Sequence, residues 1–178
     1  MIVQETIIHT EEIYSGRVVH FEVLDVRLPN GKTAKRELIT HPGAVAVVAL
    51  DENQRVLMVR QYRVAARRVL LEVPAGTLNI GEDPLVCAER ELQEETGYHP
   101  GKLESIGGIF VAPGYTTEFI HLFVATELRE SRLPGDDDEF IELDRISLPD
   151  ALGMIDRGEI IDAKSITGIL KVARKLGV

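Results

Sequence analysis

The sequence has too few cysteines for a disulfide framework and no long apolar segment for a membrane span. Among 178 residues there is one cysteine, Cys87, which excludes a disulfide scaffold and fits a reducing cytoplasm. No apolar run approaches the roughly 20 residues that cross a bilayer. The first residues, MIVQETIIHTEE, lack the basic and long apolar regions of a secretory signal. We therefore expect a cytoplasmic protein that makes no membrane contact.

The composition is that of a folded chain with an excess of acid. Apolar residues make up 44% and charged residues 28%, which excludes a mainly disordered chain. The length suits one compact domain that buries roughly two-thirds of its unfolded surface. The formal net charge of −9 argues against a nucleic-acid partner, because such a partner requires a basic surface.

The charged residues are concentrated in three segments. Residues 76–98 hold six acidic side chains against the single base Arg90, and residues 136–144 hold six with no base. Residues 55–68 hold five arginines and no acid. A charge run is most often a solvated face or loop, so the spacing within each run decides whether it indicates a site.

The order of apolar segments predicts a layered α/β or α+β domain. Asn30-Gly31 is a hairpin signal, because both residues tolerate positive φ. The continuous apolar run AVAVVAL, residues 44–50, suits a strand buried on both faces. Predicted strands cover residues 17–28, 33–40, 44–50, 55–62, 70–73, 103–111, 118–127 and 139–147, and predicted helices cover 84–96, 149–157 and 163–176.

The helix predicted over residues 84–96 has recognisable ends. Asp83 can cap its N-terminus, Pro84 suits the first helical position, and Gly97 accepts the left-handed conformation that closes a helix. At 3.6 residues per turn, the stripe expected to pack on the sheet consists of Leu85, Ala88, Leu92 and Thr96.

Three glutamates share a neighbouring stripe of this helix. Glu91, Glu94 and Glu95 follow the i, i+3, i+4 spacing, at which like charges destabilise a helix by about 0.2–0.5 kcal/mol per pair. They also lie near the partly negative C-terminal end. A divalent cation reverses this argument, because Mg²⁺ and Mn²⁺ prefer converging carboxylate oxygens. Arg90 can brace Glu94; the alternative is an ordinary exposed acidic face.

The residues around these glutamates resemble the Nudix box, G-x5-E-x7-R-E-U-x-E-E-x-G-U, in which U is a bulky aliphatic residue. Every fixed position agrees, and only the final U is replaced, by Tyr98, which is still bulky. The matching residues are Gly76, Glu82, Arg90, Glu91, Leu92, Glu94, Glu95 and Gly97. On this resemblance the chain is identified as a member of the Nudix hydrolase family, which cleaves nucleoside diphosphates linked to another group.

The resemblance implies a fold and a cofactor. The fold is an α/β Nudix-type α/β/α sandwich with a mixed sheet over residues 44–178, preceded by an N-terminal β extension over residues 1–43. The cofactor is Mg²⁺ or Mn²⁺. The implied metal ligands are Glu91, Glu94, Glu95 and the backbone carbonyl of Ala75, with Glu91 also implied in catalysis. The implied structural or orienting residues are Gly76, Glu82, Arg90 and Gly97.

Features outside the box resemble the ADP-ribose pyrophosphatase subgroup. Pro113 lies 16 residues after Gly97, and the stretches RQYR (residues 60–63) and LEVPAG (residues 71–76) agree. Ala112 departs from the serine that the subgroup often has there. The resemblance extends over about residues 17–176 and implies hydrolysis of ADP-ribose to AMP and ribose 5-phosphate.

Substrate contacts follow from the same resemblance. Arg63 would contact phosphate through its planar donor fork. Gly114 would let the loop backbone approach the ligand, and Glu118 could accept hydrogen bonds from the terminal ribose. Glu72 has two interpretations, a substrate contact or a structural ion pair with an arginine of residues 55–68.

Two further segments of this subgroup have implied roles. A carboxylate of the acidic loop would be the general base, for which we favour Glu139 with Asp137 as the near alternative; a solvated hairpin tip is the other interpretation. The N-terminal strands would pair between two subunits and complete the adenine pocket. Arg36 and Glu37 match positions that contribute to this pocket in the subgroup. We therefore expect a homodimer, with a plain edge hairpin as the alternative.

Two other functions remain open at this point. The same pyrophosphate machinery would hydrolyse another nucleotide sugar, such as GDP-mannose, and no residue reliably reads the base. A non-catalytic sensor of nucleotide sugars is the third hypothesis, although such a protein is expected to have a damaged box and an added DNA-binding unit. The intact box argues against it.

Overall fold

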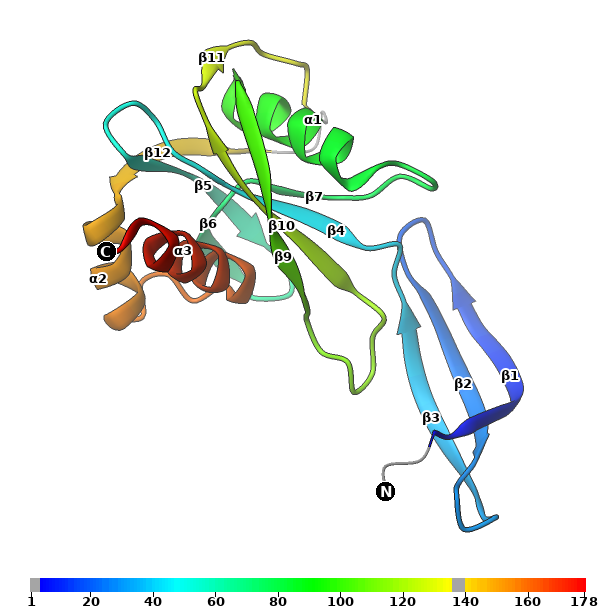
Figure 1. The fold of residues 1–178 in the computed structure, drawn as a ribbon. Coiled ribbons are helices and arrows are strands. Elements are labelled where there is room, and N and C mark those ends of the chain that lie inside the picture. Colours follow the sequence, from blue (N-terminus) through cyan, green and yellow to red (C-terminus); the bar gives the residue numbers. More distant parts are fainter. Residues whose placement is uncertain (1–3, 136–139) are drawn as a thin grey trace. The chain divides into compact units, whose positions relative to one another are not determined.

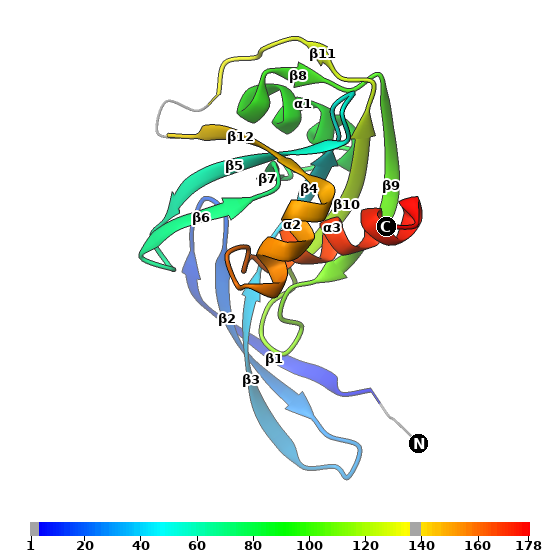
Figure 2. The same ribbon diagram turned by 90° about the vertical axis from the view of Figure 1, so that its left-hand side faces the viewer.

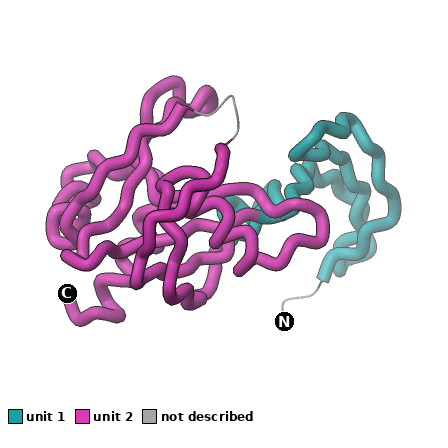
Figure 3. The backbone as a smooth tube through the Cα atoms, turned by 90° about the horizontal axis from the view of Figure 1, so that it is seen from above, with its two compact units in different colours: residues 1–43, 110–119 teal, residues 44–109, 120–178 magenta. Residues whose placement is uncertain are grey.

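The computed structural model describes residues 4–135 and 140–178. The chain forms two compact units. Unit 1 consists of residues 1–43 and 110–119, and unit 2 consists of residues 44–109 and 120–178 (Figure 3). The loop 110–119 therefore belongs with the N-terminal segment, which the sequence did not indicate.

Unit 1 is built on a three-stranded antiparallel sheet in the order β1-β2-β3 (Figure 1). The strands are β1 (Thr6–Ser15), β2 (His20–Arg27) and β3 (Thr33–Thr40). The turn between β2 and β3 contains Gly31 at φ 82°, so the hairpin prediction is confirmed. The predicted strand 17–28 is too long, because Gly16 N–H donates to the Val19 carbonyl at 2.9 Å and closes a turn there. Strand β1 was missed because all ten of its residues are exposed, so no buried face leaves an alternating pattern.

The loop of unit 1 between residues 110 and 119 is held on β3 by backbone hydrogen bonds. Ile39 N–H donates to the Tyr115 carbonyl at 2.7 Å, and Thr117 N–H donates to the Ile39 carbonyl at 3.0 Å. The rings of Phe110 and Phe119 meet edge to face at 5.0 Å. The loop that contains Gly114 and Glu118 is therefore fixed to β3 by these hydrogen bonds.

Unit 2 contains a mixed sheet, as predicted. Its order is β7-β4-β10-β9, with β4 (Ala44–Ala49) parallel to β10 (Phe119–Thr126) and antiparallel to β7 (Ala75–Thr77); β9 is Lys102–Phe110. A second sheet is antiparallel, in the order β12-β5-β6 (Glu142–Ser147, Arg55–Arg63 and Arg68–Glu72). Short strands β8 (Tyr98–His99) and β11 (Arg129–Glu130) pair with each other. Strand β12 begins at Glu142 and not at residue 139, which lies outside the described residues.

Strand β4 separates two hydrophobic cores. Its residues Ala44, Ala46 and Val48 pack with α2 (Leu148–Asp156) and α3 (Ala163–Leu176), whereas Val45, Val47 and Ala49 pack with α1 (Pro84–Thr96). Figures 1 and 2 show α1 on one side of the sheet and α2 and α3 on the other. All six residues of β4 are buried, so the strand buried on both faces and the α/β/α sandwich are confirmed.

Helix α1 has the predicted ends. The Asp83 carboxylate accepts a hydrogen bond from Leu85 N–H at 2.8 Å, and Gly97 adopts φ 79°. Leu85 was expected in the buried stripe but is 42% exposed; the buried stripe of the first turns passes through Cys87 instead. Burial raises the pKa of the Cys87 thiol to about 12, which fits a small packing residue.

None of the helices in the described part of the chain is long and apolar enough to span a bilayer.

Candidate active site

The glycine of the predicted box lies directly against one of its glutamates. A Cβ added to Gly76 would lie 1.9 Å from the carboxyl carbon of Glu91 and 2.1 and 2.3 Å from its two oxygens. Gly76 belongs to β7 and pairs with Val45 of β4. The absence of a side chain at position 76 therefore allows the Glu91 carboxylate to lie on the strand backbone.

A second glutamate of α1 is turned toward the same strand. The Glu95 carboxylate accepts a hydrogen bond from Ala75 N–H at 3.0 Å, and Glu95 is only 8% exposed. Two of the predicted metal ligands, Glu91 and Glu95, are thus brought to the consecutive residues Ala75 and Gly76, as the spacing in the sequence suggests but does not establish.

Arg90 organises the remaining acidic side chains of the box. Its Nη1 donates to Glu91 at 2.7 Å and to Glu94 at 2.9 Å, so the predicted brace on Glu94 is confirmed. Its Nε and Nη2 donate to the two oxygens of Glu82 at 3.0 and 3.1 Å. The hydrogen bonds from Arg90 lower the pKa of Glu82 to about 2. Glu82 also accepts from Asn79 N–H at 2.9 Å, which ties the loop before α1 to the helix.

The donors of this cluster fit a hard divalent cation. Three carboxylates and a backbone carbonyl are the oxygen ligands that Mg²⁺ and Mn²⁺ prefer, and the missing side chain at Gly76 lets a carboxylate reach the backbone. Among the described residues, no three His, Cys, Asp or Glu side chains are grouped as metal ligands, and Arg90 donates to both Glu91 and Glu94. The residues that could hold a metal are therefore Ala75, Glu91, Glu94 and Glu95, with some movement of their side chains.

Arg63 forms an ion pair with the buried carboxylate of Glu72. Arg63 Nε and Nη2 donate to the two Glu72 oxygens at 2.9 and 2.8 Å, and Lys164 Nζ donates to the same carboxylate at 2.5 Å. Glu72 is 1% exposed. Burial alone raises the pKa of Glu72, but the hydrogen bonds and charges of Arg63 and Lys164 outweigh it and lower that pKa. The structure thus contains the ion pair that was one interpretation of Glu72.

The arginine-rich segment does not form an unopposed basic patch. Besides the Arg63 pair, Arg55 donates to Asp51 at 2.8 Å and Arg60 donates to Asp144 at 2.6 Å. Three of the five arginines of residues 55–68 are thus paired with acids. Asp51 lies only four residues from Arg55, whereas Asp144 lies 84 residues from Arg60 and could not be recognised from the local sequence.

The other predicted site residues lie in unit 1 or outside the described residues. Arg36 and Glu37 are exposed on β3, where Arg36 pairs with Glu5 at 2.5 Å. Gly114 is exposed, and the described residues place no heavy atom within 4 Å of an added Cβ there. Glu118 N–H donates to the Thr116 hydroxyl at 3.2 Å. The two candidates for the general base, Asp137 and Glu139, lie outside the described residues.

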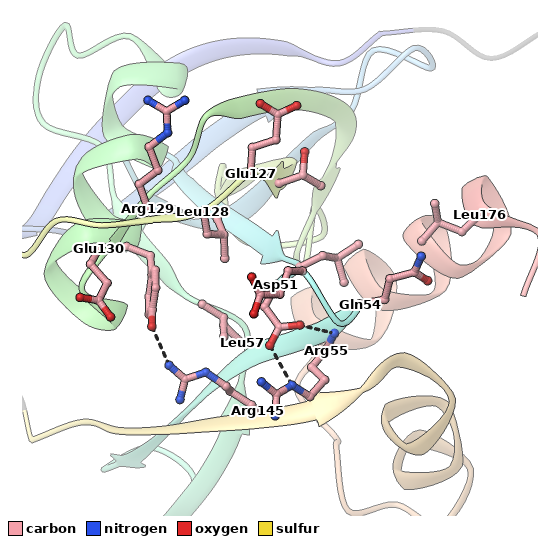
Figure 4. A pocket seen from close by; sticks show the side chains of 14 residues that line it. Asp51, Gln54, Arg55, Leu57, Glu127, Leu128, Arg129, Glu130, Arg145 and Leu176 are labelled. Carbon is pink, nitrogen blue, oxygen red and sulfur yellow. Dashed lines mark hydrogen bonds and ion pairs between the residues drawn. The ribbon is translucent and has the colours of Figure 1, made fainter.

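A pocket of about 980 Å³ lies in unit 2 beyond the carboxyl ends of the parallel strands β4 and β10 (Figure 4). Its wall contains the Asp51–Arg55 pair and a hydrogen bond of 2.8 Å from Arg145 to the Tyr98 hydroxyl. None of the described residues predicted for the site lines this pocket. Of the positions of the box, only the final one, Tyr98, belongs to its wall.

Comparison with known proteins places the chain in a family. Residues 40–167 match the NUDIX domain, and the chain belongs to the Nudix family. A solved structure described as an ADP compounds hydrolase covers 99% of this chain and 96% of its own, with a TM-score of 0.89 and 24% identity. That likeness confirms the fold.

Several curated proteins are similar over most of the length. An ADP-ribose pyrophosphatase of Bacillus subtilis is 44% identical over 168 residues, which cover 93% of this chain and 91% of that protein. A methanol dehydrogenase activator of Bacillus methanolicus is 45% identical with the same coverage. An ADP-ribose pyrophosphatase of Mycobacterium tuberculosis is 36% identical and covers 93% of this chain and 81% of that protein.

Proposed function

We propose that this chain is a metal-dependent pyrophosphohydrolase that converts ADP-ribose and water into AMP and ribose 5-phosphate. The observation that carries the chemistry is the placement of Glu91 and Glu95 against the backbone of Ala75 and Gly76. Two relatives, 44% and 36% identical, are described as ADP-ribose pyrophosphatases, which supports the choice of substrate.

Mg²⁺ or Mn²⁺ is the proposed cofactor, held by Glu91, Glu94, Glu95 and the carbonyl of Ala75. When bound, such an ion neutralises diphosphate charge and lowers the pKa of a coordinated water. The protein's own contribution is to hold the carboxylates in place. Arg90 does this through four hydrogen bonds of 2.7 to 3.1 Å to Glu82, Glu91 and Glu94.

Arg63 is the proposed contact to the diphosphate. Its Nε and Nη2 each donate one hydrogen bond to Glu72. A guanidinium has five N–H groups in a rigid fork, so two hydrogens on Nη1 and one on Nη2 are left as oriented donors. Glu72 then acts chiefly by positioning Arg63. Gly114 and Glu118 are proposed for the terminal ribose, and Arg36 and Glu37 for the adenine. Glu139 is the proposed general base, with Asp137 as the alternative and Glu91 as a further participant.

A homodimer is part of this proposal. Strand β1 exposes Ile7, Ile13 and Tyr14 by 58%, 51% and 60%, and an exposed edge strand of this length invites pairing with another chain. Light scattering should give a mass near twice 19.8 kDa. A monomeric mass at assay concentration would overturn the homodimer.

The proposed location of the protein is the cytoplasm.

A second candidate substrate is another nucleoside diphosphate sugar. A GDP-mannose pyrophosphatase of Citrobacter koseri is 36% identical over 133 residues, which cover 70% of this chain. The Bacillus methanolicus relative is described as a methanol dehydrogenase activator, a name that specifies no substrate.

The deciding experiment is a turnover panel with Mg²⁺ and with Mn²⁺. ADP-ribose, GDP-mannose, other nucleotide sugars, NADH and diadenosine polyphosphates are compared, and the products are identified. We expect the highest kcat/KM for ADP-ribose, with AMP and ribose 5-phosphate as products. A kcat/KM for ADP-ribose no higher than for the other substrates would overturn the substrate assignment.

A further inference from the structure

The first turn of α3 carries a polar cluster that sequence analysis did not single out. Its N-cap Asp162 accepts hydrogen bonds from Ser165 N–H at 3.0 Å and from the Ser165 hydroxyl at 2.6 Å. Lys164 Nζ lies 3.0 Å from the same carboxylate. Ser165 is fully buried, and the Lys164 side chain is 12% exposed.

This cluster contacts Glu72, the last residue of β6, and Val73, which follows it. Lys164 Nζ donates to the Glu72 carboxylate at 2.5 Å, and the Ser165 hydroxyl accepts from Val73 N–H at 2.8 Å. A hydroxyl that donates to Asp162 and accepts from Val73 uses its single hydrogen in one fixed direction. The first turn of α3 therefore holds residues 72 and 73 at the same time.

The same segment is held again where it enters the candidate active site. The Pro74 carbonyl accepts from Val47 N–H at 2.8 Å, and Ala75 N–H donates to Glu95 at 3.0 Å. Each residue from 72 to 75 thus has at least one defined polar contact. Because the chain is continuous, a shift at Glu72 or Val73 would move the Ala75 backbone.

We propose that Lys164 is a positioning residue for the diphosphate end of the site, and that Ser165 fixes the adjoining backbone. Lys164 and Arg63 both donate hydrogen bonds to the Glu72 carboxylate, which is therefore oriented between two cations. In this orientation Glu72 accepts from Nε and Nη2 of Arg63. The remaining donors of Arg63 are then presented in one direction. This inference rests on the proposed role of Arg63 in the reaction.

The charges show why Lys164 matters to Arg63. Glu72 and Asp162 contribute two negative charges, and Arg63 and Lys164 contribute two positive ones. Without Lys164, Arg63 is the one cation among the described residues that interacts with both Glu72 and Asp162. The Glu72 carboxylate is buried, and charge interactions are stronger there than in water. Arg63 would then be bound more completely by its own acids and would be a weaker donor to a diphosphate.

The test compares Lys164→Met, which keeps the length but removes the charge, with Lys164→Arg, which keeps the charge. Lys175→Met is the matched control, because Lys175 is an exposed lysine of the same helix that pairs with Glu104. Two quantities are measured with Mg²⁺ present: kcat and KM for ADP-ribose, and the Kd of ADP by calorimetry.

We expect Lys164→Met to raise KM and the ADP Kd about tenfold with kcat changed by less than about threefold, since binding to Arg63 is what weakens. Lys164→Arg should recover most of the binding, and Lys175→Met should match the wild type. In a Glu72→Gln background, Lys164→Met should add little, because both changes act through one carboxylate.

An unchanged ADP Kd in Lys164→Met, or additive effects of the two changes, would overturn the inference. If Lys164→Met does not fold, as judged by its thermal transition, Lys164→Gln takes its place in the same comparison. Wild-type protein that binds ADP but leaves ADP-ribose intact overturns the proposed function only, and the ADP Kd values still decide the role of Lys164. Wild-type protein that neither binds ADP nor cleaves ADP-ribose overturns both.

Discussion

Gly76 and Glu91 are so close that no side chain fits at position 76 while the carboxylate stays in place. The position of a Cβ on Gly76 lies 1.9 Å from the Glu91 carboxyl carbon. Strand β7 is paired with β4, whereas the carboxylate is the end of a flexible side chain. Of the two partners, the Glu91 carboxylate is the one that can move.

Gly76→Ala should therefore leave the fold intact and displace the Glu91 carboxylate. We expect metal-dependent turnover of ADP-ribose to fall by at least about tenfold, because displacing a ligand or reacting group from a preorganised site lowers the reaction rate. The free energy of unfolding in metal-free buffer should change by less than about 1 kcal/mol. Steady-state kinetics and urea unfolding measure the two quantities.

Gly153→Ala is the matched control for this change. Gly153 lies in α2, and a Cβ added there would be 2.9 Å from Arg157 Nη1. The Arg157 guanidinium, like the Glu91 carboxylate, is the end of a flexible charged side chain. Its turnover should equal that of the wild type. Full activity in Gly76→Ala would contradict the importance of the close approach of Glu91 to β7.

Glu95→Gln should abolish most of the turnover without unfolding the chain. The amide oxygen of glutamine can still accept the hydrogen bond from Ala75 N–H, but it is a poorer ligand for Mg²⁺ than a carboxylate. We expect kcat to fall at least about a hundredfold and the rise in melting temperature on adding Mg²⁺ to shrink. Glu89→Gln on the same helix is the control; equal turnover in the two variants would remove Glu95 from the metal site.

The Glu82–Arg90 pair should contribute stability that depends on pH. The pKa of Glu82 is lowered to about 2 by Arg90, below its ordinary value near 4.5. The contribution is therefore complete above about pH 4.5 and is lost as the pH falls toward 2. The difference in unfolding free energy between wild type and Glu82→Gln should be largest near pH 6 and should shrink toward pH 2.

Glu104 provides a comparison for this pH dependence. Its pKa is also lowered to about 2, by hydrogen bonds from Lys102 and Lys175, but its side chain is 36% exposed against 12% for Glu82. Solvent screening should make the stability difference for Glu104→Gln clearly smaller at every pH. A pH-independent difference for Glu82→Gln would show that the pair with Arg90 does not hold in solution.

The proposed general base can be identified in the acidic loop. Glu139→Gln should lower kcat by about a hundredfold or more with little change in KM, since general-base catalysis typically contributes 10²–10⁴-fold. Asp137→Asn should have a smaller effect. Glu142→Gln, an exposed position on β12, is the control, and a small loss in both loop variants would remove the loop from the mechanism.

Much of the fold could be predicted because its signals are local. The run of residues 44–50 marks a strand that is buried on both faces, and Asp83, Pro84 and Gly97 mark the ends of α1. Strand β1 could not be predicted, because ten exposed residues leave no alternation of apolar and polar side chains. Leu85 was misplaced because helical periodicity gives the spacing of a buried stripe but not which turn first meets the sheet.

The candidate site was predictable to the extent that its residues lie on one helix. The spacing of Arg90, Glu91, Glu94 and Glu95 is a property of the sequence, and the arginine brace follows from i, i+4 geometry. The pairing of Arg63 with Glu72 was one of two interpretations. Lys164 and Ser165 lie 92 residues from their partners, and no local pattern indicates such contacts.

The sequence by itself determined the acidic helix, its ends, the buried strand and the family to which the chain belongs, because each depends on residues a few positions apart. Only the tertiary structure decided which charges meet. It placed Glu91 on the backbone of Gly76, where the missing side chain makes room, and it gave Glu72 a second cation, Lys164, from 92 residues away. A buried carboxylate stays charged only with such partners, and the chain must be folded before they are side by side.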